Sequence, residues 1–589
     1  MRYLLFFVPF ICFSQFYTSS GERLQVYGSS GRVSSSSISY TVPPSGPTPG
    51  AARTAIPDYT GLTIVDVAAT YGWSAGDMTS AINSAIAAND SPGTPVVLKF
   101  DTDNGSTWEI DSPINVSDVS DLYFQFDSGL TLQQGDGEWG AGSPDDLFRF
   151  DDADNLRFYG YGATLHMEKT DFTSGEHAHV FIADNGNDVE LWGLTLEDSG
   201  GDGIYVNEWT NFKLMDLVSD NNSRQALSII SGANGEVNGC SLQGTQPNGV
   251  GAAANGPWDG LDFEPNPTSS TFDNILVKNI DMIDNDAAFL DFAWGNYDGD
   301  GNALDITIED CYASLNHQNP WTTGTGEIRF TCASDMTGTV DFTRVFIDGS
   351  TYPGIYSIME ADGPSFTYED VVLYDTNSTA TTASIRFRRI GAPCSDENTL
   401  GGFFFDNLTI YNNVDDDIID VGDLGGGDVF KNVTGNIKGI TDYTSNTISY
   451  KDSYDSGNNV NVTLSLDMDS SPPSTTLSIE ATTAIGAEDT QNDIVFTVTR
   501  TSSEVDYALP FRVAYSGTAD NRDDYHGLPS GFVIPAGAST FEITVVPRND
   551  EWTNPSSEGD ETVIITLQTM TDAYTIGTAS DTATIKETL

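Results

Sequence analysis

The sequence has few basic residues, with 24 Lys and Arg against 86 Asp and Glu, which gives a formal net charge of −62. A field of this sign repels nucleic acid and anionic membrane surfaces, so the composition excludes the usual partners of basic proteins. It also attracts divalent cations, but a solvated acidic surface accounts for the same composition. The charge therefore predicts no nucleic-acid partner and identifies no single site.

Long apolar runs are absent after the N-terminus. The first residues, "MRYLLFFVPFICFSQ", join a basic Arg2 to an apolar run that ends near Ser14. This is the layout of a secretory signal peptide, which we expect over residues 1–15. No later segment reaches the roughly 18 apolar residues that a bilayer span requires. The sequence thus predicts a secreted, extracellular protein without membrane insertion, and association with a cell surface stays open.

Cysteine is scarce as well. Of the 5 cysteines, Cys12 would leave with the signal peptide, and the other four are Cys240, Cys311, Cys332 and Cys394. They could pair in an oxidising compartment, but their spacing does not decide the pairing. The chain also lacks a phosphate-binding loop, a paired-cysteine zinc spacing, a Gly-x-Ser-x-Gly elbow and a dinucleotide fingerprint, which disfavours those chemistries.

The N-terminal part reads as a leader followed by a short helix and a strand. Residues 16–56 are rich in Ser, Gly and Pro without an apolar period, which predicts a flexible segment. In "MTSAINSAIAA", Met78, Ile82 and Ile86 recur at helical intervals, and "TPVVLKF" follows as a buried strand.

Short strands punctuated by Gly, Asn and Asp then repeat along the chain. Comparable strands are "VFIAD" at 180, "IYVNE" at 204, "LSIIS" at 227, "LDFEP" at 261, "FLDFA" at 289, "EIRFT" at 327, "IYSIM" at 355 and "SIRFR" at 384. The first steps of about 24 and 23 residues suit one turn of a parallel β-helix, and later steps of about 27 to 39 suit the same turn with inserted loops. A β-sandwich would lack this superperiod.

Two features of this region resemble a known superfamily. The helix "MTSAINSAIAA" and the run from "GDGIYVNEWTNFKLMDLVSDNNSRQALSIISGANGEVNGCSLQGTQ" to "DGLDFEPN" resemble the right-handed parallel β-helix proteins of the pectate-lyase-like superfamily. The resemblance covers residues 57–450 and implies the fold. It does not decide the reaction, because the superfamily includes hydrolases, lyases, epimerases and non-catalytic spikes.

A second domain is predicted at the C-terminus. Residues 451–474, which contain "DMDSSPPST", read as a linker, and residues 475–589 alternate as in an antiparallel sandwich. The tail resembles a Calx-beta domain through "IVFTVTRT", "GTADNRDDY", "IPAGASTFEITVVPRNDE" and "EGDETVIITL". The resemblance implies calcium as a cofactor, although the terminal acidic triplet of that family is missing here. The matching acids are Glu488, Asp524, Asp550, Glu558 and Glu561.

The stretch "WDGLDFEPNP" carries the candidate catalytic residues. With Leu261 and Phe263 packed inward, Asp262 and Glu264 both point outward, and their backbones lie about 6.6 Å apart along the strand. That spacing is at the lower edge of the roughly 6.5 to 9.5 Å that separates the carboxyl groups of inverting glycosidases. Stacked rungs would place Asp291 beside Asp262, and crowded carboxylates raise at least one pKa, which keeps a general acid protonated.

Arginines and aromatic residues near the same rungs are candidate substrate contacts. The register exposes Arg329, Arg386 and Arg388 on the face that carries the acids, and Arg224 with Gln225 lies one rung earlier, where either could orient Asp262 or Glu264. The arginines would suit an acidic or sulfated glycan, but ion pairs across rungs explain them equally well. Among the aromatic residues, Trp258 and Trp294 could stack on sugar rings.

We weigh three functions. The leading hypothesis is a glycoside hydrolase acting on an acidic or sulfated polysaccharide, with Asp262 and Glu264 as acid and base and Asp291 tuning them. A polysaccharide lyase is the second, with Lys278 or Arg329 as base and Asp259, Asp262 and Glu264 holding a metal. A non-catalytic glycan-binding or adhesion protein is the third.

Overall fold

The computed structural model describes residues 16–17, 23–24 and 50–588, except for 54, 136–138, 140–144, 173–177, 248–255, 267–268, 295–302, 318–325, 332–335, 360, 362, 379–382, 389–398, 412–416, 423–428, 441–447, 451–455, 470–473, 503 and 550–558. The chain divides into two compact units, Met1–Thr48 and Pro49–Leu589. In the first, β1 (Phe16–Tyr17) pairs antiparallel with β2 (Arg23–Leu24). The predicted signal peptide lies outside the described residues. No helix among those described is long and apolar enough to cross a membrane.

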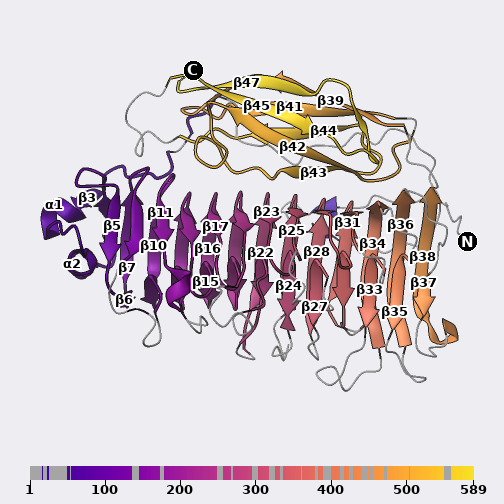
Figure 1. Cartoon of the computed structure of the whole chain (residues 1–589), viewed down its shortest axis with the longest axis horizontal. Coiled ribbons are helices and arrows are strands. Elements are labelled where there is room, and N and C mark those ends of the chain that lie inside the picture. The colour runs from indigo at the N-terminus through magenta and orange to yellow at the C-terminus, as the bar shows by residue number, and fades with distance from the viewer. Residues whose placement is uncertain are drawn as a thin grey trace, which may run out of the picture. The chain divides into compact units, whose positions relative to one another are not determined.

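The larger unit is built from three stacks of parallel strands, which we call faces I, II and III (Figure 1). One turn of the chain contributes one strand to each face, so the predicted right-handed parallel β-helix is confirmed. Face I contains β3 (Thr63–Asp66), β4 (Val96–Phe100), β7 (Ser120–Phe126), β10 (Asp154–Tyr159), β13 (Asn187–Trp192), β16 (Trp209–Met215), β19 (Gly232–Asn238), β22 (Phe272–Lys278), β25 (Ala303–Glu309), β28 (Thr337–Thr343), β31 (Ser365–Glu369), β34 (Thr399–Tyr411), β36 (Val429–Ile440) and β38 (Val460–Asp469).

Faces II and III complete each turn. Face II contains β5 (Thr107–Ile110), β8 (Thr131–Gln134), β11 (Thr164–His166), β14 (Thr195–Glu197), β17 (Val218–Asp220), β20 (Ser241–Gln243), β23 (Asp281–Ile283), β26 (Tyr312–Ser314), β29 (Phe346–Asp348) and β32 (Val372–Tyr374). Face III contains β6 (Ile114–Ser117), β9 (Phe148–Asp151), β12 (Phe181–Asp184), β15 (Ile204–Asn207), β18 (Leu227–Ile229), β21 (Leu261–Phe263), β24 (Leu290–Ala293), β27 (Ile328–Thr331), β30 (Ile355–Ser357), β33 (Ile385–Arg388), β35 (Ile419–Gly422) and β37 (Ile448–Tyr450). The eight strands that the sequence periodicity predicted are β12 to β33 of face III.

The core of the β-helix is a set of side-chain ladders. On face III, the ring of Phe292 stacks between Phe263 and Phe330 at centroid distances of 5.1 and 4.7 Å. Parallel, in-register strands place the same side chain above itself in each turn, so identical residues pack without gaps. This packing fixes the register of face III, and with it the position of every outward side chain.

The Asn and Asp residues that punctuate the repeats have a conformational role. A residue with positive φ follows strands of faces I and II at the corners, for example Asp216 (φ 56), Asn221 (φ 54) and Asn279 (φ 54). Asn and Asp tolerate this left-handed conformation better than most other residues. They also bond between turns, as Asn221 does through its Nδ2 to Asp198 Oδ1. Asn221 therefore has a structural role at a corner between two turns.

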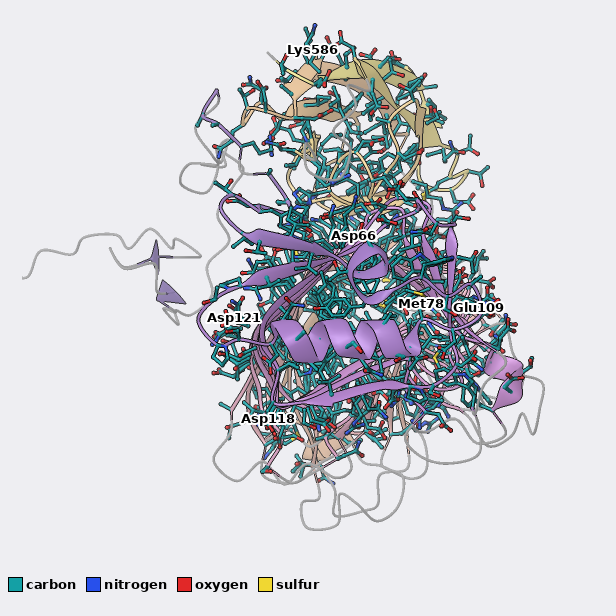
Figure 2. The ribbon with its side chains drawn as sticks, turned by 90° about the vertical axis from the view of Figure 1, so that its left-hand side faces the viewer. Asp66, Met78, Glu109, Asp118, Asp121 and Lys586 are labelled. Atoms are coloured by element: carbon teal, nitrogen blue, oxygen red, sulfur yellow. The ribbon has the colours of Figure 1, made fainter. Side chains whose placement is uncertain are left out.

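A helix covers the N-terminal end of the β-helix, as predicted. The described residues contain two helices, α1 (Val67–Tyr71) and α2 (Thr79–Asn89), with short 3-10 turns at η1 (Lys169–Asp171) and η3 (Ser456–Asn458). Ile82 and Ile86 of α2 are buried, as is Met78 just before it. The amide of Met78 donates to the carbonyl of Glu109 at 2.8 Å, and Figure 2 shows this contact at one end of α2. Met78, Ile82 and Ile86 therefore cover the N-terminal end of the core.

The C-terminal part is an antiparallel sandwich. One sheet has the order β44 (Thr540–Val545), β41 (Ile494–Thr501), β39 (Thr476–Thr483), β46 (Thr575–Ile576). The other has the order β40 (Ile485–Ala487), β47 (Ser580–Lys586), β45 (Glu561–Gln568), β42 (Leu509–Gly517), β43 (Gly531–Ile534). The sheets agree with the sandwich that the alternating pattern predicted, and the assignment to the Calx-beta family stays a prediction.

Two predicted boundaries need correction. The linker predicted over 451–474 contains β38, which pairs in parallel with β36, and its alternating residues Val462, Leu464, Leu466 and Met468 pack on the β-helix core. The leader predicted over 16–56 is anchored at its end, where Arg53 pairs with Asp493 at 2.7 Å. In both segments the Pro- and Ser-rich composition indicated a flexible chain, although some of the residues have specific partners.

The sandwich also packs directly on face II. Tyr312, Phe346 and Val372 share an apolar cluster with the sandwich residues Phe511 and Phe532. Polar contacts accompany this cluster, including a pair between Arg512 and Asp348 at 2.5 Å. Face II is therefore partly covered by the sandwich, and the predicted acids lie on face III.

Candidate functional site

The predicted register of the acids is confirmed. On face III, Ser228, Asp262, Asp291 and Arg329 are paired in successive strands β18, β21, β24 and β27. Their neighbours in each strand, such as Leu261 and Phe263, are buried in the core. Because side chains alternate along a strand, these four residues point away from the core. The acids thus form one row along the outside of face III.

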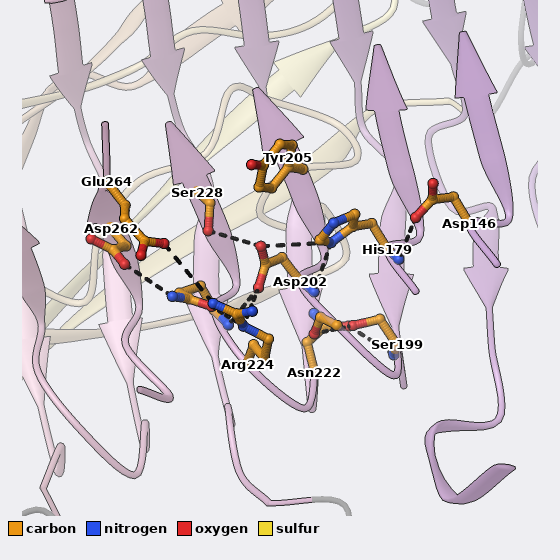
Figure 3. Close-up of polar contacts among 12 residues, drawn as sticks. Asp146, His179, Ser199, Asp202, Tyr205, Asn222, Arg224, Ser228, Asp262 and Glu264 are labelled. Carbon is orange, nitrogen blue, oxygen red and sulfur yellow. Dashed lines mark hydrogen bonds and ion pairs between the residues drawn. The ribbon is translucent and has the colours of Figure 1, made fainter. Parts of the chain in front are cut away.

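The acids differ in exposure in a way that the sequence did not predict. Asp259, Asp262 and Asp291 are all 0% exposed, whereas the side chain of Glu264 is 30% exposed. Figure 3 shows Asp262 and Glu264 next to each other at β21. Asp262 therefore points outward but is covered, and Glu264 is the member of the pair that reaches solvent.

Asp262 has one oxygen with a partner and one without. The Nε2 amide of Gln225 donates to Asp262 Oδ2 at 2.9 Å, while Oδ1 has no hydrogen-bond partner among the described residues. Burial raises the pKa of Asp262 well above its usual range, and repulsion from Glu264 and Asp259 raises it further. Asp262 therefore keeps its proton to a higher pH than an exposed Asp does. Because Oδ2 accepts from Gln225, a proton on this carboxyl would reside on Oδ1.

Arg329 supplies the positive charge beside these acids. Its Nε donates to Asp291 Oδ1 at 2.7 Å, its Nη2 donates to the other oxygen of Asp291, and Nη2 lies 3.6 Å from Asp259 Oδ2. Burial raises the pKa of Asp259, and Arg329 together with the amide of Ala288 opposes that rise. Oxygens of Asp259, Asp262 and Asp291 come within 4.8 Å of one another, a spacing that could hold a cation. The guanidinium of Arg329 already lies within ion-pair distance of two of these three carboxylates.

A second polar network lies one to two rungs toward the N-terminus (Figure 3). Asp202 Oδ2 accepts from the hydroxyl of Ser228 at 3.0 Å, and Asp202 Oδ1 lies 3.5 Å from Arg224 Nε. The amide of Asp202 donates to His179 Nδ1 at 3.0 Å, which places the ring proton on Nε2. This network connects to the acid pair because Arg224 lies 3.9 Å from Glu264. The prediction that Gln225 and Arg224 orient Asp262 and Glu264 fits these contacts.

Asp202 and Ser228 were not predicted from the sequence. A signal for Asp202 was present, because "DGI" at 202–204 and "DGL" at 259–261 place an Asp two residues before a face III strand. Gly203, which follows Asp202, has no room for a side chain, since a Cβ there would come within 2.1 Å of Ser219 Oγ. Asp202 and Asp259 are thus equivalent positions in two turns.

The remaining predicted arginines are paired too. Arg386 lies in the Arg329 row, as predicted, with its Nε 3.7 Å from Asp420, and Arg388 Nη2 contacts the same carboxylate at 2.7 Å. Ion pairs across rungs, the structural alternative considered for these residues, are therefore present. Their role in substrate binding stays a prediction.

The two predicted tryptophans lie differently. Trp294 is 0% exposed and packs in the core between Phe292, Phe330 and Phe366, so its prediction as a sugar platform is wrong. It ends a face III strand on the inward side, where apolar packing outweighs solvent contact. Trp258 is 7% exposed and so offers little of its ring to a ligand.

Of the residues considered for a lyase, Lys278 lies apart from the others. Lys278 ends a strand of face I and pairs with Glu309 at 3.4 Å, away from the acids of face III. His317 is buried near Asp259, and burial lowers its pKa, so it is neutral at physiological pH. Its Nε2 lies 3.1 Å from the carbonyl of Gly326.

The predicted calcium ligands are only partly described. Asp550 and Glu558 lie outside the described residues, while Asp524 and Glu561 contact each other. Burial raises the pKa of Asp524. Within the part of the sandwich that is described, Glu488, Asp524 and Glu561 do not bring three ligand atoms together. Of the cysteines, Cys240 and Cys311 are buried and free, and Cys332 and Cys394 lie outside the described residues.

No protein-family model matches the chain, and no curated protein matches it. Similar solved structures include the Dettilon tailspike protein, 14% identical with a TM-score of 0.41, covering 83% of this chain and 92% of that one. A surface protein and adhesin of Streptococcus pneumoniae is 11% identical, with a TM-score of 0.39 and coverage of 69% and 100%. A polygalacturonase from Erwinia carotovora is 13% identical, with a TM-score of 0.32 and coverage of 74% and 98%. At these values the similarities decide nothing about function.

Proposed function

We propose that this chain is a secreted polysaccharide-processing enzyme, a glycoside hydrolase in which Asp262 is the general acid and Glu264 the base. The observation that carries the proposal is the environment of Asp262. It is a buried carboxyl with a raised pKa, and its Oδ1 has no hydrogen-bond partner among the described residues. A general acid must hold a proton at neutral pH and direct it at an oxygen of the substrate.

The second carboxylate completes the chemistry. Glu264 is part-exposed and lies beside Arg224, whose positive charge favours the ionised form. In hydrolysis, Asp262 Oδ1, which is covered in this structure, would have to meet the glycosidic oxygen and give it a proton while Glu264 takes a proton from the attacking water. The two backbone positions lie about 6.6 Å apart along the strand, at the lower edge of the carboxyl separation of inverting glycosidases, so we propose inversion at the anomeric carbon. Asp291, held by Arg329, would tune the acid from the next rung.

The paired arginines bear on the charge of the substrate. An acidic or sulfated glycan was predicted because the arginines of this face were taken as available for anions. Arg224 instead contacts Asp202, Arg329 contacts Asp291, and both Arg386 and Arg388 contact Asp420. Glu264 beside Arg224 and Asp259 beside Arg329 bring the carboxylates to five against four arginines. We therefore propose an uncharged polysaccharide in place of an acidic one.

Two alternatives make different demands. A lyase needs a free base beside a uronate, and Lys278 lies on face I while Arg329 is held by two carboxylates. An adhesion protein needs no proton donor in its binding face, so the raised pKa of Asp262 favours the hydrolase. In either case the ligand is a glycan bound along face III.

A panel of neutral, sulfated and uronate-containing polysaccharides tests the proposal. We expect new reducing ends from a neutral member without absorption in the unsaturated-uronate band, and we expect Glu264→Gln to lose this release while still binding glycan. Asp273→Asn, an exposed acid of face I, is the matched control and should keep full activity. Products with the unsaturated band would select the lyase, and binding without products would select adhesion.

Calcium in the sandwich is a separate proposal. The acids that match the Calx-beta family would bind calcium as oxygen ligands, with Asp524 and Glu561 as the described pair. Because the sandwich shares an apolar cluster with face II, the full chain is the proper sample. We expect millimolar calcium to raise its melting temperature, less so in Asp524→Asn and unchanged in the exposed control Glu480→Gln. A melt that calcium does not shift would contradict the site.

A further inference from the structure

A mixed His and carboxylate cluster lies on face II, apart from the acids of face III. His166 ends β11 and is paired in register with Glu197, the last residue of β14. Asp198 follows Glu197 and has a positive φ of 59°, so it turns at the corner. Each of the three side chains is partly buried. Parallel stacking thus brings three potential metal ligands from two turns into one place.

One ring nitrogen of His166 faces both carboxylates. Its Nδ1 lies 3.0 Å from Glu197 Oε1 and 3.6 Å from Asp198 Oδ2. The ligand atoms of these three residues all lie within 4.8 Å of one another. An imidazole nitrogen with two carboxylate oxygens is a donor set that suits divalent transition metals, whereas calcium prefers oxygen alone.

The opposite ring nitrogen has its own carboxylate. His166 Nε2 lies 3.4 Å from Glu168 Oε1. A histidine that ligates a metal commonly donates its other N–H to a carboxylate, which fixes the tautomer and the ring orientation. Without a metal, both ring nitrogens donate to carboxylates. A metal ion would take the place of the Nδ1 proton, and the Nδ1 lone pair would then face the ion between Glu197 and Asp198.

Neighbouring groups orient the third ligand. Asn221 donates through Nδ2 to Asp198 Oδ1, which leaves Oδ2 on the side of His166. The nearby cation, Lys169, gives its ammonium protons to the carbonyl and side-chain oxygens of Asn221, at 2.9 and 2.6 Å. The ammonium is therefore held by Asn221, from where it also interacts electrostatically with Asp198.

We propose that His166, Glu197 and Asp198 bind a divalent transition metal such as Zn²⁺, with Glu168 supporting His166 from outside. The ion would join β11 to β14 across two turns and keep its remaining positions for water, because the residues are only partly buried. The site does not depend on the proposed hydrolase function.

Isothermal titration of the full chain with ZnCl₂ at pH 7.5 tests the site, with Co²⁺ absorption as an independent readout of an imidazole ligand. His166→Gln should weaken the metal affinity at least tenfold and remove the Co²⁺ signal, and Glu168→Gln should weaken it by about 10- to 100-fold. His526→Gln removes another histidine paired with a carboxylate and should leave binding intact. The metal-free melting temperatures of the variants check that each one folds.

Two outcomes would overturn the proposal. Zinc affinity that is equal in the native chain and in His166→Gln would place any bound metal elsewhere. An absence of binding in the native chain at 100-fold excess of metal would leave His166 as a protonated partner of its carboxylates only.

Discussion

Replacing Asp262 by Asn is expected to lower the rate of glycosidic-bond cleavage by about 10² to 10⁴-fold, the contribution of a positioned general acid. The amide keeps the shape of the carboxyl and can still contact Gln225, but it has no proton to give. The loss should appear in kcat more than in KM, because protonation of the leaving group belongs to the transition state.

The stability of the same variant should change in the opposite direction. The pKa of Asp262 is raised in the folded state, so this residue favours folding at low pH, and that contribution is lost as pH rises through the folded pKa. Above that pKa, the ionised and buried Asp262 disfavours folding, and Asp262→Asn removes this ionisable group. Its melting temperature should equal or exceed that of the native chain above neutral pH, and a lower value would mean that the loss of activity reflects misfolding.

Replacing Arg329 by Gln is expected to destabilise the protein by about 3 to 5 kcal/mol, the typical cost of removing one partner of a buried ion pair. Asp291 is 0% exposed and would remain charged without a counterion, as would Asp259 if it stays ionised. The shift of the denaturation midpoint measures this cost.

A double variant separates charge from packing. Arg329→Gln combined with Asp291→Asn removes both charges and should recover most of the lost stability. Lys213→Gln, which breaks an exposed pair with Glu190 at 3.5 Å, serves as the control and should cost less than about 1 kcal/mol. An unrecovered double variant would show that Arg329 stabilises by packing.

The sequence predicted the row of outward residues on face III well. The alternation in "LDFEP", "FLDFA" and "EIRFT" was sufficient, because a period of two and in-register stacking together assign each side chain to a face. The capping helix was predicted for a similar reason, since Met78, Ile82 and Ile86 had the helical interval.

Burial and partner choice were beyond the sequence pattern. The period of two predicts that Asp262 points outward. The burial of its side chain depends on distant parts of the chain, which this period does not describe. Asp420 likewise pairs with Arg386 and Arg388, which precede it by 34 and 32 positions in the neighbouring turn. Trp294 was misassigned because a strand end can turn its side chain either way, and β38 was overlooked because a Pro- and Ser-rich stretch adjoins it.

The central claim is that Asp262 carries a proton at neutral pH. Infrared difference spectra between the native chain and Asp262→Asn at pH 7 test it without knowledge of the substrate, since a protonated carboxyl has its own carbonyl band. We predict that this band is present in the native chain, is lost in Asp262→Asn and persists in the Asp273→Asn control. Spectra at pH 7 in which the carbonyl band is the same in the native chain and in Asp262→Asn would contradict the account.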